Sequence, residues 1–261
     1  MKVSIITASL NNKDSIKKSI KSVLMQEYND IEYIVVDGAS TDGTCDVIKK
    51  YQDQIAHYLS EPDTGLYHAL NKGIALSTGD IVGVLHADDE FFSDNVIAMV
   101  VEAFETTNAD MVYGNGIYLN RKNNKIIRIW NSGRCTRFKL WLGWLPLHTS
   151  VFFRSDVFER FGYYNENYKI ASDTDFLISL LYVNHVKAYW VDKYFVKMQT
   201  GGLSTSHHFL FRKWKEDYRI FRKHKFVPWL MLPSKIMLKI PQFIHRQVRK
   251  QKQKNEAKQL Q

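Results

Sequence analysis

Residues 35–44, with the sequence VVDGASTDGT, decide the fold class of this 261-residue chain. They join an apolar, β-branched run, which predicts a buried strand over residues 31–36, to a helix predicted over residues 42–51. Ser40 and Asp42, at the junction, offer the side-chain oxygen atoms that cap the start of a helix. A strand that passes at once into a helix is the repeating unit of α/β domains.

The same alternation of strand and helix continues on both sides of this stretch. Further strands are predicted over residues 3–8, 55–59, 81–85 and 110–113, and further helices over residues 14–26, 67–77 and 95–104. Such an order predicts a largely parallel sheet with helices on both faces. After residue 113 the pattern loosens, and the predicted elements are a hairpin at residues 117–119 and 126–130, a strand at residues 151–154 and a helix at residues 175–183.

Polar and acidic residues follow four of the predicted strands. They lie at residues 8–12 (ASLNN), 37–43 (DGASTDG), 61–65 (EPDTG) and 86–89 (HADD). In open α/β sheets, ligands bind beyond the carboxyl ends of the strands. Asp and Ser are common in any turn, so one such segment alone would be weak evidence. Four segments at the same edge of the sheet indicate a binding site.

Three of these strings resemble the signatures of the family-2 glycosyltransferases, which have the GT-A fold. They are residues 35–44, residues 63–73 (DTGLYHALNKG) followed by STGD at 77–80, and residues 85–89 (LHADD). The resemblance covers residues 1–205 and points to members that build bacterial surface polysaccharides. It implies a GT-A domain, with a donor-nucleotide half at residues 1–113 and an acceptor half at residues 114–205. It also implies inverting transfer of a sugar from a nucleotide donor to a hydroxyl group.

The resemblance implies a donor site at the carboxyl edge of the sheet. Thr7 and Ala8 would line the nucleobase pocket, Asp37 would bind the base, and Lys72 would lie near the diphosphate. For Asp37 the alternative is an Asx-turn at the end of a strand. The full set of expected donor-binding residues is Thr7, Ala8, Ser9, Asn11, Asp37, Ser40, Asp63, Tyr67, Asn71, Lys72, His86, Ala87 and Asp88.

The string LHADD resembles the metal-binding DxD region of the family. A diphosphate leaving group needs its negative charge neutralised, and Mg²⁺ or Mn²⁺ on a carboxylate does that. His86 occupies the first DxD position here, which leaves the main ligand open between Asp88 and Asp89. The alternative for these two aspartates is a helix cap or an acidic turn. His207, in a stretch that resembles the family's closing segment, is a third candidate ligand.

Residues 170–176 (IASDTDF) resemble the acceptor-side motif that carries the family's general base. Direct displacement at the anomeric carbon needs a carboxylate to take the proton of the acceptor hydroxyl. Asp173 is the candidate base and Asp175 the second choice, with the N-cap of the following helix as its alternative role. His148 is a further catalytic candidate, since it could contact the acceptor or the donor phosphate, or be structural.

The positive charge of the chain is concentrated at its end. The formal net charge is +9, but residues 207–261 carry +12 and residues 1–206 carry −3. We predict that residues 206–261 form a basic amphipathic helical tail that lies on an anionic membrane, with its last dozen residues disordered. The alternative is that its aromatic stripe, Phe211, Trp214, Tyr218 and Phe221, packs on the domain or on a second subunit. A nucleic-acid partner is not expected, because the body is acidic and shows no binding motif.

No secretory signal or stretch long enough to span a membrane is evident, and the two cysteines lack metal-type spacing. We therefore expect a cytoplasmic protein. Together, the family resemblance and the basic tail imply an enzyme, peripheral on the inner face of the cell membrane, that transfers a sugar from a UDP-sugar to a polyprenyl-diphosphate-linked saccharide. The alternatives are a nucleotidyltransferase and a non-catalytic nucleotide-sugar binding protein. A dehydrogenase is disfavoured, because no GxGxxG follows the first strand.

Overall fold

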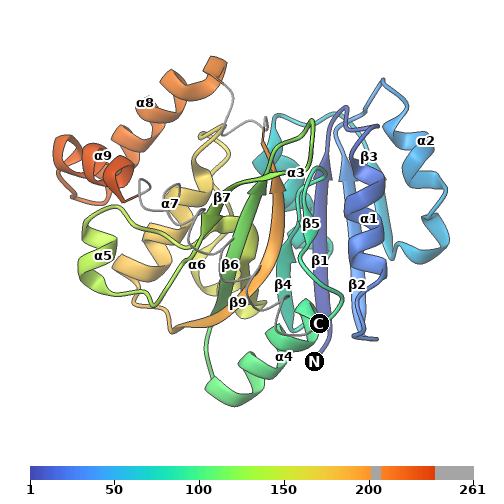
Figure 1. Ribbon diagram of the computed structural model, residues 1–261, viewed down its shortest axis with the longest axis horizontal. Helices are drawn as coiled ribbons and strands as arrows, with labels where there is room; N and C mark the ends of the chain where they lie inside the picture. The colour runs from blue at the N-terminus through green and yellow to red at the C-terminus, as the bar shows by residue number, and fades with distance from the viewer. Residues whose placement is uncertain (201–206, 239–261) are drawn as a thin grey trace, which may run out of the picture.

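The computed structural model describes residues 1–200 and 207–238, and within them nine strands form one sheet (Figure 1). The strands are β1 (Val3–Ser9), β2 (Ile31–Asp37), β3 (His57–Ser60), β4 (Ile81–Val84), β5 (Glu90–Phe91), β6 (Met111–Leu119), β7 (Ile126–Trp130), β8 (Val151–Arg154) and β9 (Ala188–Gln199). Their order across the sheet is β3-β2-β1-β4-β8-β6-β9-β5, and β7 pairs with β6.

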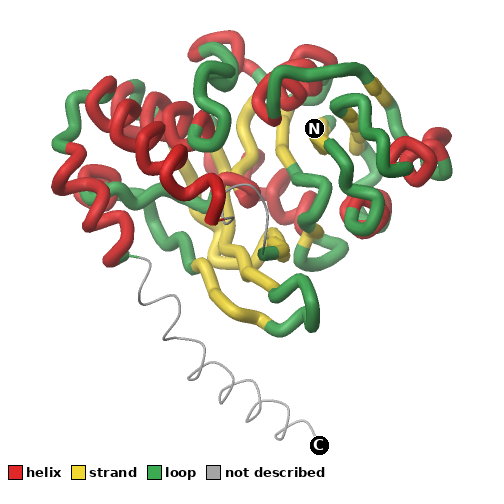
Figure 2. The backbone as a smooth tube through the Cα atoms, turned by 90° about the horizontal axis from the view of Figure 1, so that it is seen from above, coloured by secondary structure: helices red, strands yellow, loops and turns green. Residues whose placement is uncertain are grey.

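Helices cover both faces of this sheet, which lies between them when seen from above (Figure 2). The α-helices are α1 (Ile16–Leu24), α2 (Thr44–Lys49), α3 (Leu66–Leu76), α4 (Val96–Thr107), α5 (Arg137–Trp141), α6 (Asp156–Phe161), α7 (Ser172–Ile178), α8 (His207–Lys223) and α9 (Pro228–Met237). Shorter turns are η1 (Gln52–Gln54), η2 (His148–Ser150) and the π-helical η3 (Ser179–Val183). None of the described helices combines the length and apolar character needed to cross a bilayer.

The amino-terminal half of the sheet is parallel, as the sequence predicts. β1 pairs with both β2 and β4 in parallel, so that Val3 lies opposite Ile31 on one side and Ile81 on the other. Every residue of β1 is buried, because one core lies on each face of the sheet. Ile5 packs in the core that includes α1 and α4, and Ile6 packs in the core that includes α3 and α7. The carboxyl ends of these strands therefore meet at one edge.

The second half of the sheet is mixed. The predicted hairpin is confirmed as β6 and β7, although β6 is longer than predicted, and β8 lies antiparallel between β4 and β6. β9 was not predicted, and it pairs in parallel with most of β6. Helix α7 begins at Ser172 with Ala171 as its N-cap residue, so the suggestion that Asp175 is the N-cap is wrong. The GT-A-type mixed α/β sheet is nevertheless the fold class that the sequence predicts.

Helices α8 and α9 pack on the domain through one side only. Phe221 is 1% exposed and lies in a small core with Ile220, Ala171 and Ile178. The other aromatic residues of the predicted stripe face away from this core, and Phe211, Trp214 and Tyr218 are 79%, 53% and 45% exposed. Packing on the domain is therefore observed for Phe221 and not for the other three. The residues expected to be disordered lie outside the described part of the chain.

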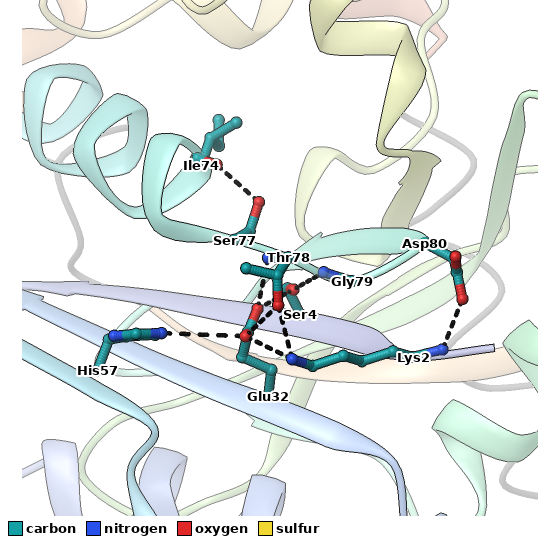
Figure 3. Close-up of polar contacts among 9 residues, drawn as sticks. All are labelled: Lys2, Ser4, Glu32, His57, Ile74, Ser77, Thr78, Gly79 and Asp80. Carbon is teal, nitrogen blue, oxygen red and sulfur yellow. Dashed lines mark hydrogen bonds and ion pairs between the residues drawn. The ribbon is translucent and has the colours of Figure 1, made fainter.

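The motif STGD at residues 77–80 connects α3 to β4. It contacts residues near the starts of β1 and β2, away from the carboxyl ends of these strands (Figure 3). The buried carboxylate of Glu32 accepts hydrogen bonds from the Thr78 backbone N–H at 2.7 Å, the Ser4 hydroxyl at 2.6 Å and the Lys2 ammonium at 2.7 Å. Gly79 follows Thr78, and a Cβ atom there would come within 2.6 Å of the Ser4 hydroxyl and 2.7 Å of the Ser4 nitrogen. This motif is therefore structural in this chain.

Replacement of Glu32 by Gln tests the strength of this network. Burial raises the pKa of Glu32, but hydrogen bonds from Lys2, Ser4 and Thr78 outweigh it and lower the pKa to about 2. The carboxylate thus stabilises the fold above its unfolded pKa of about 4.3, and this stability is lost as the pH falls toward 2. We expect Glu32→Gln to lower the free energy of unfolding by about 2 kcal/mol at pH 7, and by progressively less below pH 4.

Urea unfolding of the wild type and the variant between pH 3 and pH 7 measures this difference. Asp53→Asn is a suitable control, because Asp53 is exposed in η1 and should change stability little at any pH. A Glu32→Gln penalty that is independent of pH would contradict the role of the ionised carboxylate.

Candidate active site

A cavity of about 530 Å³ opens beyond the carboxyl ends of β1 and β4. The end of β1, the loop after β4, the start of α3, the residues around the start of α7 and the end of β9 contribute to its lining. It brings together the following residues predicted for the site: Ala8, Ser9, Asp63, Tyr67, His86, Ala87, Asp88, Asp89, His148 and Asp173. The segments that follow three of the parallel strands therefore do converge.

Other predicted donor residues lie outside this lining. The carboxylate of Asp37 accepts hydrogen bonds from the Ser40 backbone N–H at 2.8 Å, the Ser40 hydroxyl at 2.5 Å and the Ser60 hydroxyl at 3.0 Å. The Asp37 side chain thus holds the turn after β2, but through the N–H three residues on and not two, so the turn is not the Asx-turn named as the alternative. Thr7 is buried on the opposite side of β1, where its hydroxyl accepts a hydrogen bond from Tyr33 at 3.1 Å.

Asn11, Asn71 and Lys72 also lie outside the cavity lining and join neighbouring segments. The Asn11 side chain accepts a hydrogen bond from the backbone N–H of residue 41, which links the loops after β1 and β2. Asn71 donates to the Tyr164 carbonyl and to Glu166. Lys72 forms an ion pair with Glu61 at 2.6 Å. In this structure the three side chains hold loops around the cavity.

Asp88 and Asp89 place two adjacent carboxylates at the cavity. Asp89 is 2% exposed, and one of its oxygen atoms accepts a hydrogen bond from the Gln199 backbone N–H at 3.3 Å. Its second oxygen, Oδ2, has no hydrogen-bond partner in the described part of the chain, and neither does the side-chain oxygen of Gln199. Burial raises the pKa of both aspartates, the charge of Asp88 raises that of Asp89 further, and Arg121 partly opposes the rise at Asp88.

These carboxylates fit a divalent cation, because a buried carboxylate oxygen without a partner is costly and a cation would relieve that cost. Among residues 1–200 and 207–238, no group of three or more His, Cys, Asp or Glu residues is arranged to hold a metal ion. A Mg²⁺ or Mn²⁺ ion here would need further ligands from water and from a bound phosphate, which is usual for Mg²⁺. The side chain of His207 lies outside the described part.

Asp173 lies on the lining of the same cavity, and two neighbours contact its carboxylate. His148 Nδ1 is 3.3 Å from one oxygen atom, and the Tyr67 hydroxyl is 3.1 Å from the other. Burial raises the pKa of Asp173, but the charges of His148, Lys213 and Lys235 outweigh it, and the net pKa is lowered. Burial also lowers the pKa of His148 and raises that of Tyr67. At neutral pH this arrangement keeps Asp173 ionised, with a hydrogen bond from the Tyr67 hydroxyl and with His148 Nδ1 at ion-pair distance.

Asp175, two residues further along α7, has a different environment. Its carboxylate lies 2.8 Å from the Lys223 ammonium and 2.7 Å from His224 Nε2, and it lines neither this cavity nor the smaller one beside it. Burial raises the pKa of Asp175, but Lys223, at the end of α8, and His224, which follows it, outweigh burial and lower the pKa. The sequence placed Asp173 before Asp175 as the candidate base, and of the two only Asp173 lines the cavity.

His86, at the first DxD position, is a neutral, partly buried imidazole. Burial, together with the nearby His148, lowers its pKa to about 3, although Asp173 acts in the opposite direction. The His86 and His148 rings are 5.5 Å apart between centroids. His86 therefore adds no charge to the cavity.

The cavity is also lined by three basic residues that were not predicted from the sequence: Arg121, Lys169 and Arg212. They lie in the turn between β6 and β7, just before α7, and on α8. Lys169 donates to the Thr64 carbonyl at 2.8 Å, and Arg212 pairs with Glu216 at 3.3 Å. None belongs to a recognisable motif, so only the fold reveals that they share the cavity with the carboxylates.

A mixed sheet of this topology with carboxylates beyond the ends of its parallel strands defines an α/β protein of the GT-A class. The chain belongs to glycosyl transferase family 2, whose model matches residues 4–175. An uncharacterized glycosyltransferase of Mycobacterium tuberculosis is 33% identical over 185 residues, which are 67% of each chain. A PGL/p-HBAD biosynthesis glycosyltransferase of the same organism is 30% identical over 189 residues, or 67% of this chain and 68% of the other.

Crystal structures with the same fold include two with bound nucleotide-sugars. Residues 1–349 of S. aureus TarS in complex with UDP-GlcNAc align with a TM-score of 0.70 and 18% identity, over 86% of this chain and 65% of the other. The mannosyltransferase PcManGT from Pyrobaculum calidifontis, in complex with GDP-Man and Mn²⁺, aligns with a TM-score of 0.64, over 85% and 63%. The match spans only 39% of the longer TarS chain. These similarities establish the fold.

The raised pKa of Asp89 leads to a prediction about stability. A carboxyl group whose pKa is raised on folding destabilises the fold once the pH exceeds its unfolded pKa. Asn can accept the same Gln199 N–H without a charge. We therefore expect Asp89→Asn to raise the free energy of unfolding by about 1 to 3 kcal/mol at pH 7 in EDTA, and to weaken stabilisation by Mn²⁺.

Thermal unfolding of both proteins with EDTA and with Mn²⁺ measures the two effects. Asp94→Asn, which changes an exposed carboxylate a few residues away, is the control and should alter neither. An Asp89→Asn protein that is less stable than the wild type in EDTA would contradict the idea that this carboxylate lacks a compensating charge.

Proposed function

We propose that this chain is an inverting glycosyltransferase that moves a sugar from a nucleotide-sugar to a hydroxyl group. The observation that carries the proposal is the Asp173 carboxylate, ionised and held by Tyr67 and His148 on the lining of the same cavity as Asp88 and Asp89. A candidate general base and a pair of carboxylates suited to a cation thus share one cavity. Family membership supports the class of reaction.

The donor in this proposal is a UDP-sugar in the cavity of about 530 Å³. UDP is favoured because TarS residues 1–349 bind UDP-GlcNAc in a similar fold. Asp88 and Asp89 would hold Mg²⁺ or Mn²⁺, which would neutralise the diphosphate charge as the bond to the sugar breaks. Arg121, Lys169 and Arg212 add positive charge on the same lining, where an anionic leaving group would benefit from it.

The acceptor oxygen would attack the anomeric carbon from the face opposite the diphosphate. The new C–O bond forms as the bond to the diphosphate oxygen breaks, and Asp173 takes the hydroxyl proton. One displacement of this kind inverts the configuration at that carbon. Tyr67 and the Nδ1–H of His148 would hold the carboxylate so that its remaining lone pairs face the acceptor. Asp175 already accepts hydrogen bonds from Lys223 and His224, so it serves to position α7.

The acceptor in this proposal is a polyprenyl-diphosphate-linked saccharide in surface-polysaccharide assembly, met at the cytoplasmic face of the membrane. Exposed aromatic residues on α8 and α9, including Trp214 and Trp229, support a membrane contact. Exposed basic residues lie beside them on α8, and such a mixture suits the interface of an anionic bilayer. Residues 206–261 would then act as a peripheral anchor for the domain formed by residues 1–205.

The proposed roles of the two aspartates are separated by Asp173→Asn and Asp175→Asn. We expect Asp173→Asn to lower kcat by about 10² to 10⁴-fold, the range typical of a general base, while Mn²⁺-dependent binding of UDP stays within about 2-fold. Asp175→Asn removes the charge that pairs the buried Asp175 with the half-exposed Lys223 and the buried His224, so it should lower stability by about 1 to 3 kcal/mol and reduce kcat far less when the protein is folded.

Transfer or hydrolysis of UDP-sugars measures kcat in this comparison, and thermal shift with UDP, GDP, dTDP and CMP identifies the nucleotide. An Asp173→Asn protein with wild-type turnover would overturn the assignment of the base. Release of pyrophosphate in place of UDP would favour a nucleotidyltransferase, and nucleotide binding without turnover of any sugar donor would favour a binding protein.

The membrane contact predicts that the full chain sediments with vesicles. We expect binding to phosphatidylglycerol vesicles, little binding to phosphatidylcholine vesicles, and about ten-fold weaker binding for the double variant Trp214→Ser/Trp229→Ser. Met25→Ser removes a comparably exposed apolar side chain after α1 and should bind as the wild type does. Unchanged binding by the tryptophan variant would exclude this surface as the membrane contact.

A further inference from the structure

A second, smaller cavity of about 120 Å³ lies on the other side of Asp173. Asp173, His148 and Tyr118 line both cavities and therefore form the wall between them. The remaining lining of the smaller cavity comes from the β6–β7 hairpin, the segment around Trp144, α7, α8 and α9. A group bound there would lie against the proposed base from the side away from Asp88 and Asp89.

Three cationic side chains line this second cavity. They are Arg128 from β7, Lys213 from α8 and Lys235 from α9. The Lys235 ammonium lies 2.9 and 3.0 Å from the two carboxylate oxygens of Asp217. The Arg128 guanidinium lies over the Trp130 ring, 4.4 Å from its centroid, and over the Tyr118 ring at 5.0 Å. The cavity is thus small, with polar and apolar surface in about equal shares, and its three cations outnumber the Asp173 carboxylate on the same lining.

Lys213 differs from the other two cations. Its ammonium makes no hydrogen bond or ion pair to any residue within 1–200 and 207–238, although its side chain is largely withdrawn from solvent. Burial lowers its pKa and the charge of Lys235 lowers it further, while Asp173 and Asp217 oppose this. A buried ammonium without an acceptor is costly for the folded protein. Such a group is explained when a ligand supplies the missing anion.

We propose that this second cavity binds a phosphoryl group of the acceptor, with Lys213 as its principal contact and Arg128 and Lys235 as supporting charges. This proposal rests on the function proposed above, since it assigns the acceptor to the second cavity and the donor to the first. The volume suits one small anionic group, which is far smaller than a nucleotide-sugar. Three cations converging on one space suit a phosphoryl group better than a carboxylate, which carries less charge and fewer acceptor oxygens.

The consequence concerns which hydroxyl reacts. An acceptor whose phosphoryl group is bound at Lys213 can present to Asp173 only the hydroxyl groups that lie close to that phosphoryl group. The second cavity would therefore select acceptors that carry phosphate near the reacting sugar, and the membrane-facing helices α8 and α9 supply two of its three cations.

The test measures binding of methyl phosphate and of acetate to the full chain in EDTA, by calorimetry. We expect methyl phosphate to bind the wild type and Lys215→Met equally, because Lys215 is exposed on the same helix. Lys213→Met should bind it at least ten-fold more weakly, and Lys213→Arg should retain binding. Without ligand, Lys213→Met should unfold at the same temperature as the wild type or higher, since it removes a buried charge that has no partner.

Equal binding of methyl phosphate by Lys213→Met and the wild type would overturn the proposal, as would undetectable binding by the wild type. Acetate that binds as tightly as methyl phosphate would overturn the phosphoryl assignment and point to an acidic sugar. Strong destabilisation by Lys213→Met would show that the lysine is structural. The result is independent of the donor site, because Mn²⁺-dependent binding of UDP and the turnover of Asp173→Asn test that site separately.

Discussion

The contact between Glu216 of α8 and the start of α7 is the constraint on which the candidate site depends. The buried Glu216 carboxylate accepts hydrogen bonds from the backbone N–H groups of Lys169, Ile170 and Ala171 at 3.0, 2.9 and 3.0 Å. Helices leave such groups without partners at their starts, so α8 supplies the cap that α7 lacks in its own sequence. One turn later Asp175 is bound by α8 as well. Asp173 lies between these two attachments, and its position is therefore fixed by a segment about forty residues further along the chain.

The groups around Asp173 include two that lack a partner in the described part of the chain. In the first cavity it is the buried Oδ2 of Asp89, although Arg121, Lys169 and Arg212 share that lining. The second cavity holds cations, of which Lys213 lacks an acceptor in the described part of the chain. Folding alone favours neither arrangement, because each leaves a buried polar group without a partner. Both are explained if a cation with a diphosphate enters one cavity and an anionic acceptor enters the other, with the ionised Asp173 between them.

Sequence reasoning predicted the parallel half of the sheet because its strands are short apolar runs separated by helices with a clear period. It missed β9, whose burial follows no strict alternation and which includes the charged residues Asp192, Lys193 and Lys197. Asp88, Asp89 and Asp173 line the same cavity, as expected, because each lies just after a predicted strand or just before a predicted helix. The contacts of the Asp37 carboxylate could not be predicted from the sequence, because one of the hydroxyl groups that donate to it belongs to Ser60, on the neighbouring strand. The contacts of Glu216, Lys213 and Asp175 are all long-range, and no local pattern predicts them.

This chain has His86, and not an acidic residue, at the first position of the DxD motif. This difference is consistent with the charges of the residues around Asp173. An acidic residue at that position would lie beside His148 and close to Asp88 and Asp173, in a region where burial already raises the pKa of Asp88 and Asp89. A further negative charge there would raise the pKa of Asp173 as well and favour its protonated form. A neutral imidazole fills the space without that effect and packs against the His148 ring. The cation would then depend on Asp88 and Asp89 alone among the described residues, so the donor's own phosphates would have to complete its coordination.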